Sequence, residues 1–192
     1  MTKALITGGA GFIAHHTISY LLKHTDWEII TLDRLDYSGN LNRLHDIMLS
    51  FDPEVRKRVK IVHHDLKAEL NPLVCSEIGQ VDYILHLAAG SHVDRSISAP
   101  DTFIETNILG TYSLLKASLN YYDENKIRNF LFIHISTDEV FGSLELGEKS
   151  FNENTQYKPN SPYSASKAAS DHLVRSFNKT YKLPSTLLNC SN

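Results

Sequence analysis

The sequence predicts an α/β protein with a doubly wound parallel sheet of six strands and helices on both faces. Short apolar runs alternate with longer amphipathic segments along the 192 residues, and this alternation is typical of parallel strands joined by helical crossovers. The first apolar run passes through a cluster of glycines into an amphipathic segment, so a strand, a tight turn and a helix follow one another. Since 42% of the residues are hydrophobic and 21% are charged, we expect one globular domain over residues 1–192.

The first predicted strand, residues 3–7, runs into a glycine turn that precedes the first helix. The turn and the helix start read Gly8-Gly9-Ala10-Gly11-Phe12-Ile13-Ala14. Where side chains are missing, a pyrophosphate can approach the backbone at the helix N-terminus, whose unpaired N–H groups and dipole favour an anion. A turn that uses glycine for steric reasons alone is the alternative. The residues expected to bind a dinucleotide here are Gly8, Gly11, Phe12 and Ile13.

The second predicted strand, residues 27–33, ends in Asp33. A carboxylate about 20 residues beyond the glycines can accept both ribose hydroxyls of an adenosine. Asp33 therefore favours NAD over NADP as the cofactor. Arg34 follows directly and leaves a contact with a 2′-phosphate open.

The third predicted strand, residues 59–63, is followed by Asp65 and Leu66. Both residues are expected to lie at the cofactor, because the carboxyl ends of parallel strands meet at one edge of the sheet. Asp65 could accept from the adenine amino group. It could equally cap a helix that begins near Lys67.

The fourth predicted strand, residues 81–87, opens into small residues that begin with Ala88. Small side chains let the backbone pass close to a cofactor. A polar loop follows, and apolar periodicity then predicts one helix over residues 101–122. Ligands are expected outside the carboxyl ends of the first and fourth strands, where the strand order reverses.

The fifth predicted strand is apolar over residues 130–135 and then turns polar, reading Ser136-Thr137-Asp138-Glu139. Adjacent carboxylates share one small volume, so one can be pushed toward its protonated form while the other stays ionised. An acid and base pair needs this difference. A solvated turn after a buried strand is the alternative.

A helix predicted over residues 163–181 carries Tyr163 and Lys167 four positions apart, on one face. An ammonium nearby lowers the pKa of a phenol, so Tyr163 could act as a base. Thr137, at the end of the fifth strand, could hold the same substrate oxygen. A surface Tyr stacked on a Lys is the alternative. The final strand is expected at residues 185–189.

The bulk composition argues against several classes of partner. The net charge is -3 and no long basic run is present, which disfavours a nucleic-acid partner. No apolar stretch approaches the ~18 residues of a membrane span, and the start leaves no room for a signal peptide, so a cytoplasmic protein is expected. Cys75 and Cys190 show no metal-ligand or disulfide spacing and are expected to be buried thiols. No metal site is predicted.

The glycine turn, Asp33, Thr137 and the Tyr163/Lys167 pair together resemble the extended short-chain dehydrogenase/reductase family. That resemblance implies a Rossmann-type fold. Within the family, four segments resemble the nucleotide-sugar 4,6-dehydratases, namely residues 86–89, 91–96, 136–140 and 189–192.

The resemblance implies a lyase that expels water from a nucleotide-activated glucose, with dTDP-glucose as the substrate. Tyr163, with its pKa lowered by Lys167 and by the charge of the nicotinamide, would take the proton of the C4 hydroxyl while NAD accepts the C4 hydride. Glu139 would then remove the C5 proton while Asp138 protonates the departing C6 hydroxyl. Hydride would return to C6, so NAD would be retained between turnovers.

The resemblance also implies the substrate contacts and the assembly. The helices over 101–122 and 163–181 resemble those that pair relatives into homodimers. The residues expected at the sugar are His92, Thr137 and Asn192.

Two departures from the family pattern stand out, Ala14 and Gly90, where relatives have Gly and Glu. The chain is also expected to be an N-terminal fragment that lacks the substrate-binding C-terminal domain. Two other functions stay open. A nucleotide-sugar 4-epimerase would use Tyr163 and Lys167 without the acid pair, and a non-catalytic module would bind NAD alone.

Overall fold

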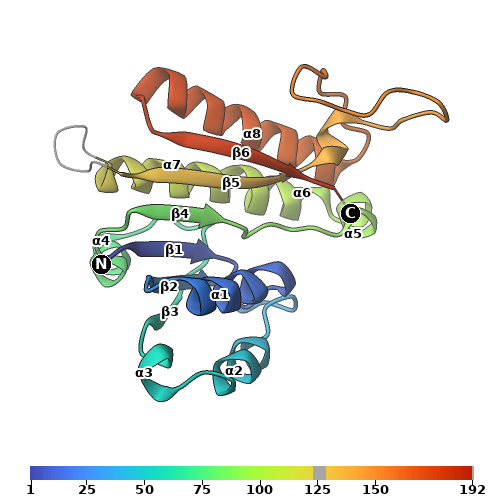
Figure 1. Cartoon of the computed structure of the whole chain (residues 1–192). Helices are drawn as coiled ribbons and strands as arrows, with labels where there is room; N and C mark the ends of the chain where they lie inside the picture. The colour runs from blue at the N-terminus through green and yellow to red at the C-terminus, as the bar shows by residue number, and fades with distance from the viewer. Residues whose placement is uncertain (123–128, 192) are drawn as a thin grey trace.

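The computed structural model describes residues 1–122 and 129–191. Within them, six parallel strands form one sheet in the order β3-β2-β1-β4-β5-β6, with helices packed against it (Figure 1). The predicted doubly wound parallel sheet is confirmed, and its order reverses between β1 and β4, as expected. The strands are β1 (Lys3–Thr7), β2 (Glu28–Asp33), β3 (Val59–His63), β4 (Tyr83–His86), β5 (Leu131–Thr137) and β6 (Ser185–Cys190).

The connections between the strands are helical, with loops at their ends. A capping box at Ser161 starts the longest helix, α8, because its hydroxyl accepts from the Ser164 backbone and the Ser164 side chain bonds back. The helices are α1 (Phe12–His24), α2 (Leu41–Leu49), α3 (Pro53–Arg56), α4 (Pro72–Ile78), α5 (Val93–Ser98), α6 (Pro100–Phe103), the π-helix η1 (Ile104–Leu109), α7 (Gly110–Tyr121), the 3-10 helix η2 (Asp138–Phe141) and α8 (Pro162–Tyr181).

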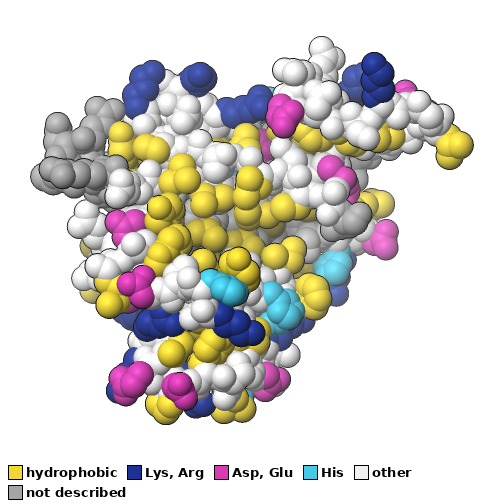
Figure 2. Space-filling view, viewed as in Figure 1, with side chains coloured by type: hydrophobic (Ala, Val, Ile, Leu, Met, Phe, Trp, Pro, Cys, Tyr) yellow, Lys and Arg dark blue, Asp and Glu magenta, His cyan; other side chains and the backbone are white. Residues whose placement is uncertain are grey.

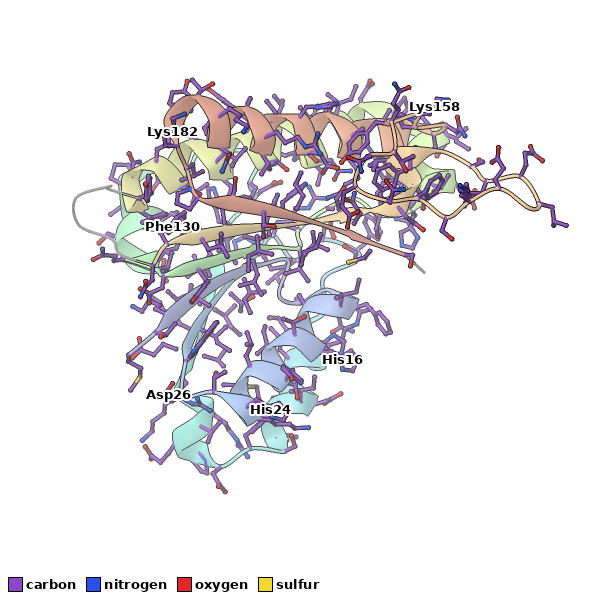
Figure 3. All side chains as sticks on the ribbon, turned by 45° about the horizontal axis from the view of Figure 1, so that its top comes forward. His16, His24, Asp26, Phe130, Lys158 and Lys182 are labelled. Atoms are coloured by element: carbon purple, nitrogen blue, oxygen red, sulfur yellow. The ribbon has the colours of Figure 1, made fainter. Side chains whose placement is uncertain are left out.

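Two apolar clusters cover the two faces of the sheet. One joins β1 and β2 to α1 and α2 through buried residues such as Ile6, Ile18 and Leu44. The larger one joins the strands to α4, α7 and α8, with Phe132 and Leu114 fully buried. Figure 3 shows side chains filling the layer between α8 and the strands, from Lys158 before the helix to Lys182 at its end. This division of the helices between the faces is what a doubly wound sheet requires.

One face of β5 and β6 lies outside this cover. Ile133 pairs with Thr186 and Ile135 with Leu188, so these side chains point to the same side of the sheet. Leu188 is 47% exposed. Hydrophobic side chains gather in the middle of this view of the surface (Figure 2). β6 is also an edge strand, so its outer backbone groups have no strand partner in the described part of the sheet.

Four predictions about individual segments are wrong. The polar loop expected after the fourth strand is partly helical, because Val93–Ser98 form α5. The helix expected near Lys67 is a turn, because the Asp65 side chain accepts from the Lys67 backbone N–H, and the helix begins at Pro72 with Asn71 as its cap. The single helix expected over 101–122 is interrupted by the π-helix η1. Cys190 is exposed instead of buried, because it lies on the edge strand.

Candidate functional site

A cavity of about 670 Å³ lies at the carboxyl ends of the central strands. It extends from the loops after β2 and β3, past the glycine turn, to β5 and the start of α8. This is the position at which doubly wound sheets bind ligands. The structure brings together, as residues lining this one cavity, Gly8, Gly11, Phe12, Ile13, Asp33, Asp65, Leu66, Ala88, His92, Thr137, Glu139, Tyr163 and Lys167.

Two predicted site residues are not among those that line the cavity. Asp138 is next to Glu139 in η2 and half-buried, and Asn192 lies outside the described residues.

No group of three or more His, Cys, Asp or Glu side chains in the described residues is arranged to hold a metal ion. None of the described helices has the length and apolar character needed to cross a membrane.

The glycine turn is shaped by close approaches that a side chain would block. Gly8 has a φ of 73°, and a Cβ there would lie 2.9 Å from the Ala88 Cα. A Cβ on Gly9 would lie 1.4 Å from the Thr31 Oγ1. Gly11 is the N-cap of α1 and provides no side-chain cap, so the first N–H groups of α1 are not capped by its side chain and an anion can accept from them.

Asp33 is held in place at the other end of this turn. Its Oδ2 accepts from the Ala10 backbone N–H at 3.0 Å, and its Oδ1 accepts from the Leu35 N–H at 2.8 Å. The residue is 9% exposed. Each oxygen keeps a further lone pair, so the fixed carboxylate can still accept ribose hydroxyls.

Thr137 ends β5 and positions the acid pair. Its Oγ1 accepts from the Glu139 backbone N–H at 3.2 Å and caps η2, which directs Glu139 into the cavity. Burial raises the pKa of Glu139, and the neighbouring Asp138 carboxylate raises it further. The raised pKa belongs to the residue expected to act as the base, and a base with a raised pKa is better matched to neutral pH.

Tyr163 and Lys167 both line the cavity from the first turns of α8. Burial raises the pKa of Tyr163, its hydrogen bond with Thr137 lowers it in part, and nearby carboxylates, Glu139 first, raise it again. The predicted lowering of this pKa by Lys167 is therefore wrong for the chain alone. Lys167 instead donates to the Ile135 carbonyl at 2.7 Å, and burial lowers the pKa of Lys167 to about 8.

A buried carboxylate lies one helical turn beyond Lys167. Asp171 is fully buried, and its Oδ2 accepts from the Ser136 and Tyr157 hydroxyls, each at 2.8 Å. Its Oδ1 lies 3.3 Å from the His134 Nε2. Burial, and then the charge of Lys167, lower the pKa of His134 to about 4, against the opposing effect of Asp171. The carboxylate thus faces a neutral imidazole, and its charge offsets in part the lowering of the Lys167 pKa by burial, with a smaller effect from Cys190.

A second buried network ties the two halves of the sheet together. His86 on β4 is bonded through Nδ1 to the Thr7 Oγ1 of β1 at 2.7 Å and through Nε2 to the Thr111 Oγ1 at 3.0 Å. The Asn107 side chain, in η1, bonds to both the N–H and the carbonyl of Gly90 and donates to the Ser166 Oγ. Sequence analysis did not single out Thr111, Asn107 or the buried Asp171. For Asp171, its spacing of four residues from Lys167 on a helix is a signal that could have found it.

Gly90 has a packing role that a side chain would disturb. A Cβ there would lie 3.1 Å from the Phe103 ring, which packs edge-on against Tyr163 with ring centroids 6.3 Å apart. We expect Gly90→Ala to displace Phe103 and to destabilise the chain by about 1–3 kcal/mol, the usual cost of overpacking. Urea unfolding measures this loss. The variant Gly90→Ala/Phe103→Leu, which removes the ring, should recover part of it; equal stabilities for Gly90→Ala and wild type would contradict the packing role.

Comparison with known proteins places these features in a family context. The family model described as GDP-mannose 4,6 dehydratase matches residues 5–192. A dTDP-glucose 4,6-dehydratase of Salmonella typhimurium is 47% identical over 203 residues, which cover 99% of this chain and 54% of that relative. The chain therefore spans about half the length of the curated relatives it matches.

Solved structures show the same fold. A dTDP-glucose 4,6-dehydratase of Streptomyces venezuelae, solved with NAD bound, superposes with a TM-score of 0.85 at 39% identity, covering 98% of this chain and 55% of that one. A UDP-Glc/GlcNAc 4-epimerase of Campylobacter jejuni superposes with a TM-score of 0.81 at 27% identity, covering 98% and 53%. The dehydratase is thus the more similar of the two in both sequence and fold.

Proposed function

The chain belongs to the family described as GDP-mannose 4,6 dehydratase, and from that membership we propose that it forms the cofactor-binding and acid–base part of a NAD-dependent nucleotide-sugar 4,6-dehydratase. The observation that carries this proposal is the Thr137-Asp138-Glu139 triplet at the end of β5 and the start of η2. Thr137 and Glu139 line the same cavity as the glycine turn. The proposed substrate is dTDP-glucose, supported by the 47% identical relative, which is a dTDP-glucose 4,6-dehydratase.

NAD is the proposed cofactor, and the residues present fit it. The glycine turn leaves room that a Cβ would fill, and the N-terminus of α1 offers N–H groups to a pyrophosphate. Asp33 is fixed where it can accept ribose hydroxyls, and Asp65, Leu66 and Ala88 line the same cavity. When bound, the nicotinamide supplies the acceptor and later the donor of hydride.

Tyr163 is the proposed base at the C4 hydroxyl of the sugar. Its phenol is buried beside the Thr137 hydroxyl, so both can contact one substrate oxygen. Lys167 lines the same cavity but does not lower the pKa of Tyr163 in the chain alone. Its proposed role is to stabilise the Tyr163 phenolate once a cofactor is bound. Because burial and the acid pair raise the pKa of Tyr163 in the chain alone, this activation depends on the charges that a bound cofactor adds.

The acid pair is proposed to remove water across C5 and C6. Glu139 lines the cavity and has a raised pKa, which suits a base that takes the C5 proton. Asp138 protonates the leaving C6 hydroxyl. Once C4 is a ketone the C5 proton is acidic, so the two carboxyl groups need only move protons at adjacent carbons. His92 and Asn192 remain proposed substrate contacts.

A 4-epimerase is the second candidate, favoured by the superposition with the Campylobacter jejuni enzyme. It would use Tyr163 and Lys167 in the same way. It would give Asp138 and Glu139 no chemical task, and this makes it the weaker proposal.

Mass spectrometry of the product separates the candidates. The chain is incubated with dTDP-glucose and NAD, and NAD binding is measured by calorimetry. The longest form of the protein that cells express is treated in the same way. Loss of one water supports the dehydratase, whereas an unchanged mass with inverted C4 supports the epimerase. If both forms bind NAD and neither changes the sugar, the result supports a non-catalytic NAD-binding module.

We further propose a cytoplasmic homodimer. The helices expected at its interface carry exposed apolar side chains, among them Ile104 and Leu109 on η1, Tyr112 on α7 and Tyr181 on α8. Burying such side chains between two copies would remove them from water. Sedimentation equilibrium should give twice the monomer mass, and substituting Tyr112 and Leu109 with Ser should shift it to the monomer; a monomer at all concentrations would contradict the dimer.

A further inference from the structure

Arg34, at the adenosine end of the cavity, is held in an ion pair by Asp36. Its Nε donates to the Asp36 Oδ2 at 2.7 Å, and its Nη2 lies 2.5 Å from the same oxygen. Its Nη1 donates to the Thr106 Oγ1 at 3.2 Å and lies 3.7 Å from the Asp65 Oδ2. Each guanidinium nitrogen therefore has a partner, contributed by the loops after β2 and β3 and by η1.

Asp36 is itself fixed on its other side. Its Oδ1 accepts from the Ser38 backbone N–H at 2.9 Å and from the Ser38 hydroxyl at 2.7 Å. The Asp36 and Arg34 side chains are 25% and 23% exposed. Burial alone would raise the pKa of Asp36, but the Ser38 hydrogen bonds and the charge of Arg34 outweigh it and lower that pKa. The carboxylate is ionised and cancels the charge of Arg34.

This pairing bears on the choice between the two dinucleotides. NADP differs from NAD by a phosphate on the adenosine ribose, and arginine is the side chain that best recognises such a group, through two parallel N–H donors. Arg34 and Asp36 line the cavity beside Asp33, so an unpaired Arg34 would be close to a 2′-phosphate. In the structure, the Arg34 N–H groups that face Asp36 are already bonded to it, and the Asp36 carboxylate balances the positive charge of Arg34.

We propose that Asp36 is a specificity-determining residue, which excludes NADP by holding Arg34 in an ion pair that a 2′-phosphate would have to break. The proposal rests on the proposed NAD binding and adds a second determinant to Asp33. Asp33 selects for the ribose hydroxyls, whereas Asp36 removes the cation that would otherwise accept the phosphate. Part of the preference for NAD over NADP thus comes from an interaction that disfavours NADP.

Calorimetric titration of the chain with NAD and NADP tests this inference without any catalytic assay. Asp36→Ala should raise the affinity for NADP at least about tenfold, the scale of one charged hydrogen bond, while NAD affinity changes little because Asp33 is intact. Asp46→Ala is the matched control. It removes the same charge from an exposed position on α2 and leaves Arg34 paired, so the preference should stay as in wild type.

The double variant Arg34→Ala/Asp36→Ala completes the test. It should lose the gain in NADP affinity, because the cation released by Asp36→Ala is then absent. A gain that survives in the double variant, or an equal gain in Asp46→Ala, would overturn the inference, as would an unchanged preference in Asp36→Ala. If no variant binds either dinucleotide, the proposed function fails and this inference with it; if NAD binds and only the preference is unmoved, the inference alone fails.

Discussion

Glu139→Gln is expected to lower the rate of water loss by about 10²–10⁴-fold, the usual contribution of a general base, while oxidation at C4 continues. The amide has nearly the same shape but cannot accept the C5 proton. Tyr163, the proposed base at C4, is untouched. Reduced nicotinamide should therefore accumulate on the protein, visible by its absorbance, while the mass of the sugar product shows no loss of water.

Stability measurements separate this chemical effect from misfolding. Burial and Asp138 raise the pKa of Glu139, so the folded state disfavours its charged form. A carboxyl with a raised pKa contributes stability that is present in acid and is lost as the pH rises through that pKa. The glutamine variant should thus be at least as stable as wild type at neutral pH. Glu145→Gln, at an exposed position beyond η2, is the matched control; water loss at the wild-type rate in Glu139→Gln would rule out Glu139 as the base.

Asp171→Ala is expected to cost about 3–5 kcal/mol of unfolding free energy, because it removes one partner from a buried charged network. The Ser136 and Tyr157 hydroxyls would lose their acceptor, and the buried Lys167 would lose a nearby negative charge. Because the free energy of unfolding of a protein is typically about 5–15 kcal/mol, this loss is a large share of it. Chemical denaturation of purified chain measures it.

Asp171→Asn distinguishes charge from hydrogen bonding in the same experiment. Its amide oxygen can still accept from both hydroxyls, so the variant should lose less stability than Asp171→Ala. It lacks the charge, so the pKa of Lys167 should fall below the value of about 8 that it has now; NMR of the lysine Nζ group follows that change. Asp46→Ala, on exposed α2, should change stability by no more than about 0.5 kcal/mol. Equal stabilities for Asp171→Ala and Asp46→Ala would contradict the role given to Asp171.

The sheet could be predicted from the sequence because its signals are local. The strand ending in Asp33 and the glycines at 8, 9 and 11 are each determined by a few neighbouring residues, and the structure places them as expected. The interruption of the helix over 101–122 could not be predicted. A π-helix inserts part of a turn, so the residues on either side keep their apolar periodicity while Asn107 is turned toward Gly90.

The site could be predicted only as far as single motifs reach. Tyr163, Lys167 and the acid pair were found because their chemistry is recognisable at fixed spacings. The raised pKa of Tyr163 was not, because it depends on how deeply the phenol is buried and on the carboxylates nearby. Asp36 likewise became meaningful only when the fold brought Thr106 and Asp65 to the other side of Arg34.

The hydrogen bond between Thr7 and His86 also bears on how the chain folds. It joins residues 79 positions apart, at the junction where β4 pairs with β1. The glycine turn and Asp33 come from the segment before this junction, and the acid pair and Tyr163 from the segment after it. Long-range closures of this kind are slow compared with local turns. Neither segment alone contains the whole cavity, so the cavity is complete only when the two segments are joined through the pairing of β1 with β4.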